Sequence, residues 1–313
     1  MQRRRIVIDT DTASDDVVAL LYALRQSDVV IEAITVVAGN LPLELCVKNA
    51  FVSIEKAGTY EPPVYMGAQK PLCKELFTSE YVHGSDGMGE MLLPSQKGVA
   101  QEEHAANAIV SLARKYPGEI DLITLGPLTN LALAAILEPN LSSLLSSVWV
   151  MGGAGSKIGN ITPVAEFNLF VDPHAAQIVL DANLKPQFIG WDVSTDETFL
   201  NEKDMKTLEK GSETSRFALR CNKTLVELNA KYWGRIGFDL PDPTAMIAFL
   251  HPSIIEKQRE AFCQMSCDDS VTQGQLVIDW QNVLGKSSNA TIIEKIDGQK
   301  FKKLLFDSLL VDC

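Results

Sequence analysis

Residues 5–24 of the chain read RIVIDTDTASDDVVALLYAL. A short apolar run at 6–8 leads into an acidic connection, and an amphipathic stretch follows over 17–24. This succession predicts a β-strand, a tight connection and an α-helix. Four aspartates lie within eight residues: Asp9, Asp11, Asp15 and Asp16. The first pair is therefore predicted at the carboxyl end of the strand, and the second pair in the first turn of the helix.

This concentration of acid indicates a metal or substrate site. Unpaired carboxylates only a few ångströms apart repel each other. A hard cation removes that repulsion, and Ca²⁺ takes roughly six to eight oxygen ligands. Asp15 and Asp16 could instead simply favour a helix N-terminus, but that role leaves Asp9 and Asp11 unexplained. In open parallel sheets, ligands bind at the carboxyl ends of the strands, where Asp9 and Asp11 are expected.

Length and composition narrow the possible classes of protein. The chain has 313 residues, 46% of them hydrophobic, and we expect one domain over 1–313. The formal net charge of −12 argues against a nucleic-acid partner. No apolar run reaches membrane-spanning length, and the start of the chain has no signal-peptide pattern. Six dispersed cysteines without a CxxC pair suggest reduced thiols, so we expect a cytoplasmic protein.

Strand-like and helix-like segments alternate along most of the chain. Strands are expected at 29–37, 63–66, 122–125, 148–151 and 188–193, and helices at 43–57, 104–115, from 126–130 onward and at 245–250. This alternation predicts an α/β fold with a mostly parallel open sheet and helices on both faces.

Several segments depart from this alternation. Residues 67–103 and 152–170 are predicted to be long loops, which in compact domains are usually functional. A helical region at about 204–230 is expected to form a cap. Strand-like segments at 275–280 and 290–296 suggest a small C-terminal hairpin.

Further polar groups fall where the carboxyl ends of strands should meet. They are Asn40, the carbonyl of Leu125, Asn160, Glu166, Asn168, Asp242 and, in the first long loop, His83. Each has an ordinary alternative. Asn40 and Asp242 could be helix caps, Glu166 and Asn168 ordinary loop residues, and His83 a turn residue.

Taken in order, these motifs resemble the nucleoside hydrolases, also called inosine-uridine preferring nucleoside N-ribohydrolases. The four aspartates fit the family's Asp-x-Asp-x-x-x-Asp-Asp signature. Further matches over residues 5 to about 250 are Val37–Asn40, Gly126–Asn130, Met151–Gly153, Ala165–Asn168, Asp172-Pro173 and Asp242. The resemblance implies a Rossmann-like nucleoside hydrolase fold.

The resemblance also implies roles for individual residues. The Ca²⁺ ligands would be Asp11, Asp16, Asp242 and the carbonyl of Leu125, and Asp11 would be the general base that deprotonates the attacking water. The substrate-binding residues would be Asp15, Asn40, Asn168 and Asp242 for the ribose hydroxyls, Asn160 and Glu166 for the 5′-hydroxyl, and Met151. Members of the family are commonly homodimers or homotetramers.

The chain departs from the family pattern beside Asp242. Many members have a histidine there, close to the leaving base, but this chain has Pro241, which cannot donate a proton. The leaving-group acid is therefore open, with His83 as the first candidate. Other candidates, or aromatic groups that could stack on the base, are Tyr232, Trp233 and Arg235. Tyr232 and Trp233 could instead serve core or interface packing, and the preferred base is not indicated.

The sequence thus predicts Ca²⁺-dependent hydrolysis of the N-glycosidic bond of ribonucleosides through an oxocarbenium-like transition state. The alternative is a catalytically silent nucleoside- or sugar-binding protein on the same scaffold, which Pro241 alone favours. A haloacid-dehalogenase-like phosphatase also has Asp-x-Asp after its first strand, but it gives no role to the loop around Glu166. An EF-hand would need a loop glycine and a closing glutamate, which are absent here.

Overall fold

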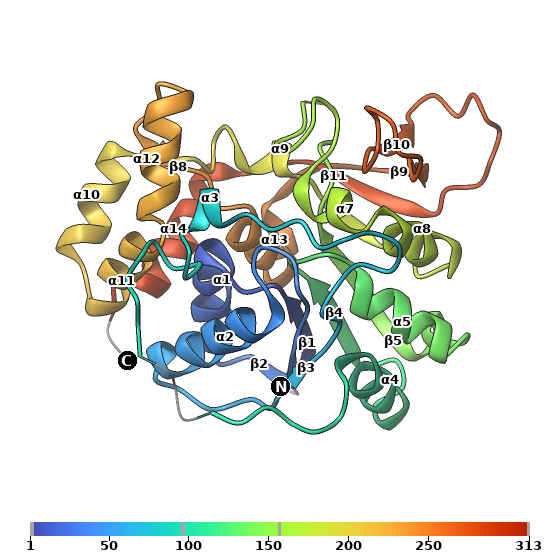
Figure 1. Ribbon diagram of the computed structural model, residues 1–313, viewed down its shortest axis with the longest axis horizontal. Coiled ribbons are helices and arrows are strands. Elements are labelled where there is room, and N and C mark those ends of the chain that lie inside the picture. Colours follow the sequence, from blue (N-terminus) through green and yellow to red (C-terminus); the bar gives the residue numbers. More distant parts are fainter. Residues whose placement is uncertain (1–2, 95–97, 156–157, 312–313) are drawn as a thin grey trace.

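The computed structural model describes residues 3–94, 98–155 and 158–311, and its centre is a nine-stranded sheet (Figure 1). The strand order is β10-β9-β11-β6-β5-β4-β1-β2-β3. These strands are β1 (Arg4–Thr10), β2 (Val29–Val36), β3 (Val64–Met66), β4 (Ile120–Thr124), β5 (Leu145–Met151), β6 (Gln187–Ile189), β9 (Ile255–Met265), β10 (Leu276–Asp279) and β11 (Ala290–Ile296). β7 (Leu200–Asn201) and β8 (Gly237–Phe238) pair separately. From β3 to β11 every neighbouring pair is parallel, whereas β9 is antiparallel to both neighbours, so the mostly parallel open sheet is confirmed.

Helices cover both faces of this sheet. They are α1 (Ser14–Leu24), α2 (Leu43–Ala57), α3 (Glu80–His83), α4 (Ala105–Lys115), α5 (Thr129–Leu137), α6 (Leu141–Leu144), α7 (Phe167–Val171), α8 (Pro173–Asp181), α9 (Trp191–Ser194), α10 (Glu202–Lys210), α11 (Glu213–Cys221), α12 (Lys223–Tyr232), α13 (Pro241–Leu250), the 3₁₀ turn η1 (Pro252–Ile254) and α14 (Gly298–Leu309). α1, α2, α13 and α14 contribute to one hydrophobic core, and α4, α5 and α8 to a second.

The first strand contributes to both cores because its side chains alternate between the faces of the sheet. Ile6 and Ile8 belong to the first core and Val7 to the second, and all three are fully buried. A continuous apolar run is typical of a parallel strand with helices on both sides. This burial fixes β1 at the centre of the sheet and places the following aspartates at its carboxyl edge.

The predicted cap is confirmed as the three helices α10, α11 and α12, hereafter the cap helices. They extend to one side of the sheet in Figure 1, and α12 packs against α3 from the first long loop. Within the described residues, no helix has the length and apolar character needed to cross a membrane.

Two local predictions were wrong. The strand expected at 188–193 ends at Ile189, because Gly190 is the N-cap residue of α9, which begins at Trp191. The C-terminal hairpin is present, but it consists of β9 and β10, whereas β11 lies on the other side of β9 and pairs with β6. β9 gave no strand signal because its first half, IEKQRE, is charged and largely exposed.

Candidate active site

The acidic side chains predicted as a site converge at the carboxyl edge of the sheet. Asp11 follows β1, Asp15 and Asp16 lie in the first turn of α1, and Asp242 lies in the first turn of α13. Oxygens of Asp15, Asp16 and Asp242 all lie within 4.8 Å of one another, and the three residues are buried. These four aspartates are called the acidic cluster below.

Asp11 is held tightly between two backbone segments. Its Oδ2 accepts a hydrogen bond of 2.7 Å from the backbone N–H of Asn40. A Cβ atom on Gly39 would lie 2.2 Å from that oxygen, and one on Gly126 would lie 2.6 Å from Oδ1, so both positions require glycine. Oδ1 is buried and has no hydrogen-bond partner among the described residues. A buried acceptor without a donor is costly, and a bound cation would offset that cost.

Asp16 is fixed by the loop that it helps to close. Its Oδ1 accepts a hydrogen bond of 2.5 Å from the Thr10 hydroxyl. Its Oδ2 accepts one of 2.9 Å from the Ala13 backbone N–H, and Asn40 Nδ2 lies 3.4 Å away. The local sequence thus places Asp16 at the third position of α1, where a carboxylate can satisfy an N–H at the start of the helix.

Burial and mutual repulsion make ionisation of the cluster unfavourable. Burial, followed by weaker contributions from neighbouring acids, raises the pKa of Asp15 and of Asp16 to about 6. The pKa of Asp11 and that of Asp242 are raised well above the usual range by burial first and then by the charges of the other cluster members. A bound cation would reverse this effect by stabilising the ionised forms.

The donor set fits a hard divalent cation. The carboxylate oxygens of Asp15, Asp16 and Asp242 lie close enough together to hold one ion. The strand-end carbonyl of Leu125, which lines the cavity, accepts a hydrogen bond of 2.6 Å from Asn168 Nδ2. Asp11, whose Oδ1 is unpartnered, was expected among the ligands but does not belong to this group of closely spaced oxygens. Ligands of this kind suit Ca²⁺ or Mg²⁺ rather than a soft metal. The cluster can therefore hold a metal ion.

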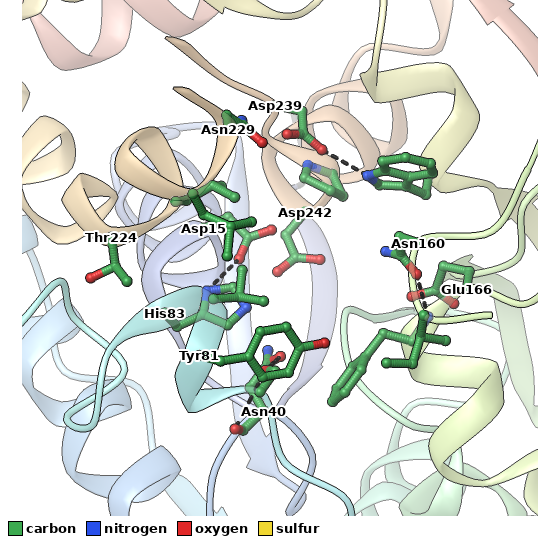
Figure 2. A pocket seen from close by; sticks show the side chains of 18 of the residues that line it. Asp15, Asn40, Tyr81, His83, Asn160, Glu166, Thr224, Asn229, Asp239 and Asp242 are labelled. Carbon is green, nitrogen blue, oxygen red and sulfur yellow. Dashed lines mark hydrogen bonds and ion pairs between the residues drawn. The ribbon is translucent and has the colours of Figure 1, made fainter. Parts of the chain in front are cut away.

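A cavity of 660 Å³ opens above the cluster, which is within the usual size range for small-molecule sites (Figure 2). It brings together most of the residues predicted from sequence: Asp15, Asn40, His83, Leu125, Met151, Asn160, Glu166, Asn168, Tyr232, Trp233 and Asp242. Asp11 and Asp16 are fully buried and do not line it. Figure 2 shows Asp242 near the centre, with Asp15 and His83 on one side and Asn160 and Glu166 on the other.

Glu166 and Asn160 organise the loop that follows β5. Glu166 caps α7: its Oε1 accepts a hydrogen bond from the Asn168 N–H at 2.8 Å, and its Oε2 accepts one from the Gly153 N–H at 3.0 Å. Burial raises the pKa of Glu166 to about 7. Asn160 Oδ1 accepts a hydrogen bond of 2.9 Å from the Phe167 N–H. These bonds hold both side chains at the cavity wall.

His83 lies at the end of α3, at the cavity wall. Its Nδ1 is 2.6 Å from the Ser14 hydroxyl and 3.9 Å from Asp15 Oδ1. Burial lowers the pKa of His83 to about 4, so the imidazole is neutral at pH 7. The acidic neighbours oppose this shift only weakly, because burial makes the larger contribution.

The aromatic pair at the end of α12 is exposed. Tyr232 is 66% exposed and Trp233 58%, which excludes core packing for both. Both line the cavity, so their rings are available to a bound ligand.

Tyr81, Trp191 and Asp239 are among the cavity residues that were not predicted from the sequence. Trp191 could have been found, because it comes two residues after the end of β6 and so lies at the same sheet edge as the aspartates. The strand expected at 188–193 included Trp191, so its place at the site was not recognised. Asp239 lies between β8 and α13, and no local pattern marks it.

Comparison with known proteins identifies the family. The sequence profile described as "Inosine-uridine preferring nucleoside hydrolase" matches residues 6–303. The chain belongs to this family. The enzyme class expected from the sequence, a nucleoside hydrolase, is thereby confirmed.

Individual relatives of the family match over nearly their whole length. The pyrimidine-specific ribonucleoside hydrolase RihA of Shewanella sp. (strain ANA-3) is 32% identical over 313 residues, covering 98% of this chain and 96% of the relative. The inosine-uridine preferring nucleoside hydrolase of Crithidia fasciculata is 31% identical over 308 residues, covering 98% and 97%. The structure of a plant nucleoside hydrolase superimposes with a TM-score of 0.93 at 25% identity, covering 99% of each chain. These matches support a nucleoside hydrolase fold for the whole described chain.

Proposed function

We propose that this nucleoside hydrolase is Ca²⁺-dependent and cleaves the N-glycosidic bond of ribonucleosides to free base and ribose. The observation that carries the proposal is the unpartnered Asp11 Oδ1 within a buried acidic cluster below a nucleoside-sized cavity. The named relatives act on different bases, one pyrimidine-specific and one inosine-uridine preferring, so the proposal covers ribonucleosides as a class.

The cation would be held by Asp11, Asp16, Asp242 and the Leu125 carbonyl. When bound, it would supply positive charge that keeps these carboxylates ionised and acidifies a nearby water. Asp15 lies close enough to Asp16 and Asp242 to be a further ligand, although we propose that it binds ribose. The all-oxygen donor set supports a hard ion.

The cavity residues would bind and orient the sugar. Hydroxyl groups need hydrogen-bond partners of both kinds, which the carboxylates of Asp15 and Asp242 and the amides of Asn40 and Asn168 provide. Asn160 and Glu166 would face the 5′-hydroxyl, and Met151 would contact the ribose from the end of β5. Positive charge builds on the ribose as the bond breaks, and the surrounding carboxylates would stabilise it.

Asp11 would act as general base. Two glycines and the Asn40 N–H fix its position, which leaves Oδ1 available to take a proton from the attacking water. A base positioned in this way contributes about 10²–10⁴ in rate.

The leaving base would contact His83, Tyr232 and Trp233. His83 would donate a hydrogen bond from a neutral imidazole, because its low pKa disfavours the charged form at pH 7. The exposed rings of Tyr232 and Trp233 would stack on the base.

An assay with ribonucleosides tests the proposal. The protein is incubated with Ca²⁺ and a panel of purine and pyrimidine ribonucleosides, and released ribose is measured as reducing sugar. Release from at least one substrate, abolished by Asp11→Ala without loss of the folded circular-dichroism spectrum, is the expected result. Binding without any release would instead support the silent binding protein. Near-normal turnover by Asp11→Ala would remove Asp11 from the role of base.

We further propose that the 313 residues act as one domain, since the site combines residues from β1 through α13. A homodimer or homotetramer and a cytoplasmic location remain predictions from the sequence.

A further inference from the structure

The carboxyl group of Asp239 has no place in the proposed chemistry. Asp239 lines the cavity together with Trp191, and the Trp191 Nε1–H donates a hydrogen bond of 2.7 Å to Asp239 Oδ2. The two residues are 48 positions apart in the sequence. Neither belongs to the acidic cluster.

Three elements converge to hold this pair. Trp191 begins α9, and its backbone N–H donates a hydrogen bond of 2.8 Å to the Gly153 carbonyl. Asp239 lies in the short connection between β8 and α13. Burial raises the pKa of Asp239, and the bond from Trp191 together with the nearby side chain of Asn229, from α12, partly offsets that rise.

Asp239 has acceptor capacity beyond the bond from Trp191. A carboxylate offers about four lone-pair positions, and the Trp191 N–H accounts for one. If the only role of Asp239 were to connect the β8–α13 segment to α9 through a hydrogen bond, its carboxylate would not need to face the cavity. Burial of a charge at a cavity wall is costly and is common where a ligand is bound.

The position of Asp239 points to the nucleobase rather than the sugar. The proposed ribose ligands lie around Asp242, and the proposed 5′ ligands are Asn160 and Glu166. Figure 2 shows Asp239 and Asn229 together beyond Asp242, on the side opposite Asn40. Pro241, between Asp239 and Asp242 in the sequence, offers no hydrogen bond from its side chain. A base at this wall would therefore find Asp239 as its carboxylate partner.

We propose that Asp239 receives the nucleobase by accepting a hydrogen bond from one of its N–H groups, and that Trp191 is the positioning residue that holds Asp239 in place. The inference rests on the proposed function. It makes Asp239 a determinant of specificity for bases that carry an N–H group, such as hypoxanthine and uracil.

Two kinds of substrate with the same sugar separate base recognition from sugar recognition. Inosine and uridine carry N–H groups on the base, whereas 4-nitrophenyl β-D-ribofuranoside has none on its leaving group. Asp239→Asn should lower kcat/KM for inosine and uridine by about 10- to 100-fold, the usual effect of losing a hydrogen bond to a charged group. Its kcat/KM for the nitrophenyl riboside should stay within about threefold of wild type.

Two variants serve as controls. Trp191→Phe keeps an aromatic ring but removes the N–H that holds Asp239, so it should show a smaller loss confined to the same substrates. Asp242→Asn should lower activity on both kinds of substrate, because Asp242 is placed at the sugar. Equal losses for Asp239→Asn on both kinds, or no loss on nucleosides, would overturn the inference.

A binding measurement keeps this test independent of the proposed function. If the wild-type protein cleaves no nucleoside, the proposed function fails, and calorimetry with free hypoxanthine and uracil decides the role of Asp239. The inference requires Asp239→Asn to weaken binding of at least one free base by tenfold or more. Equal affinities of wild type and variant for both bases would overturn it.

Discussion

Removing divalent cations should make the stability of this protein fall as pH rises. The reason is burial, which raises the pKa of Asp15 and Asp16 to about 6 and that of Asp9 and Glu166 to about 7. In the unfolded chain these groups ionise near 4. Between about pH 4 and 7 the folded state therefore binds more protons than the unfolded state, and the free energy of unfolding falls as pH increases.

The size of the effect follows from the pKa shifts. Each pKa unit corresponds to about 1.4 kcal/mol, so Asp9 alone accounts for about 3 kcal/mol between pH 5 and pH 8. For a chain of this size that is about 5 °C in Tm. A cation at 1,000 times its Kd restores about 4 kcal/mol at pH 8. At pH 5 the cation competes with protons on its proposed ligand Asp16, so it should stabilise less.

Differential scanning calorimetry tests both the fall in stability with rising pH and the larger gain from Ca²⁺ at high pH. The Tm is measured at pH 5 and pH 8, in EDTA and in CaCl₂. Asp242→Asn should reduce both the pH dependence in EDTA and the gain from Ca²⁺, whereas Asp269→Asn, at an exposed site in the β9–β10 connection, should change neither. A Tm in EDTA that is equal or higher at pH 8, or a Ca²⁺ gain of the same size at both pH values, would refute the reasoning.

Two further substitutions test the geometry of the site. His83→Gln should lower kcat/KM for nucleosides by up to about tenfold. The pH dependence of kcat/KM above pH 5 should not change, because the pKa of His83 is about 4. If the variant lost a change in rate that the wild type shows near pH 6.5, this prediction would be contradicted. Gly126→Ala should reduce kcat by about 100-fold with an unchanged circular-dichroism spectrum, since the added Cβ would lie 2.6 Å from Asp11 Oδ1. Wild-type kcat in Gly126→Ala would show that Asp11 tolerates displacement.

The sequence alone determined the class of fold and the location of the acidic cluster. Both depend on short-range patterns: an apolar run followed by acid predicts a strand, and alternating strands and helices predict parallel pairing. Once the strands are parallel, their carboxyl ends share one edge, so the residues that follow β1 and β5 are brought near each other. The order of motifs was sufficient to indicate the family.

Only the tertiary structure decided which groups face one another and how they ionise. The Trp191–Asp239 bond and the pairing of His83 with Ser14 join segments 48 and 69 residues apart. The strand β9 forms despite its charged first half because both of its neighbours pair with it. Hydrogen-bond partners, burial and pKa depend on atoms supplied by distant parts of the chain. The local order of residues therefore located the acids, and the packing of the whole chain determined their chemistry.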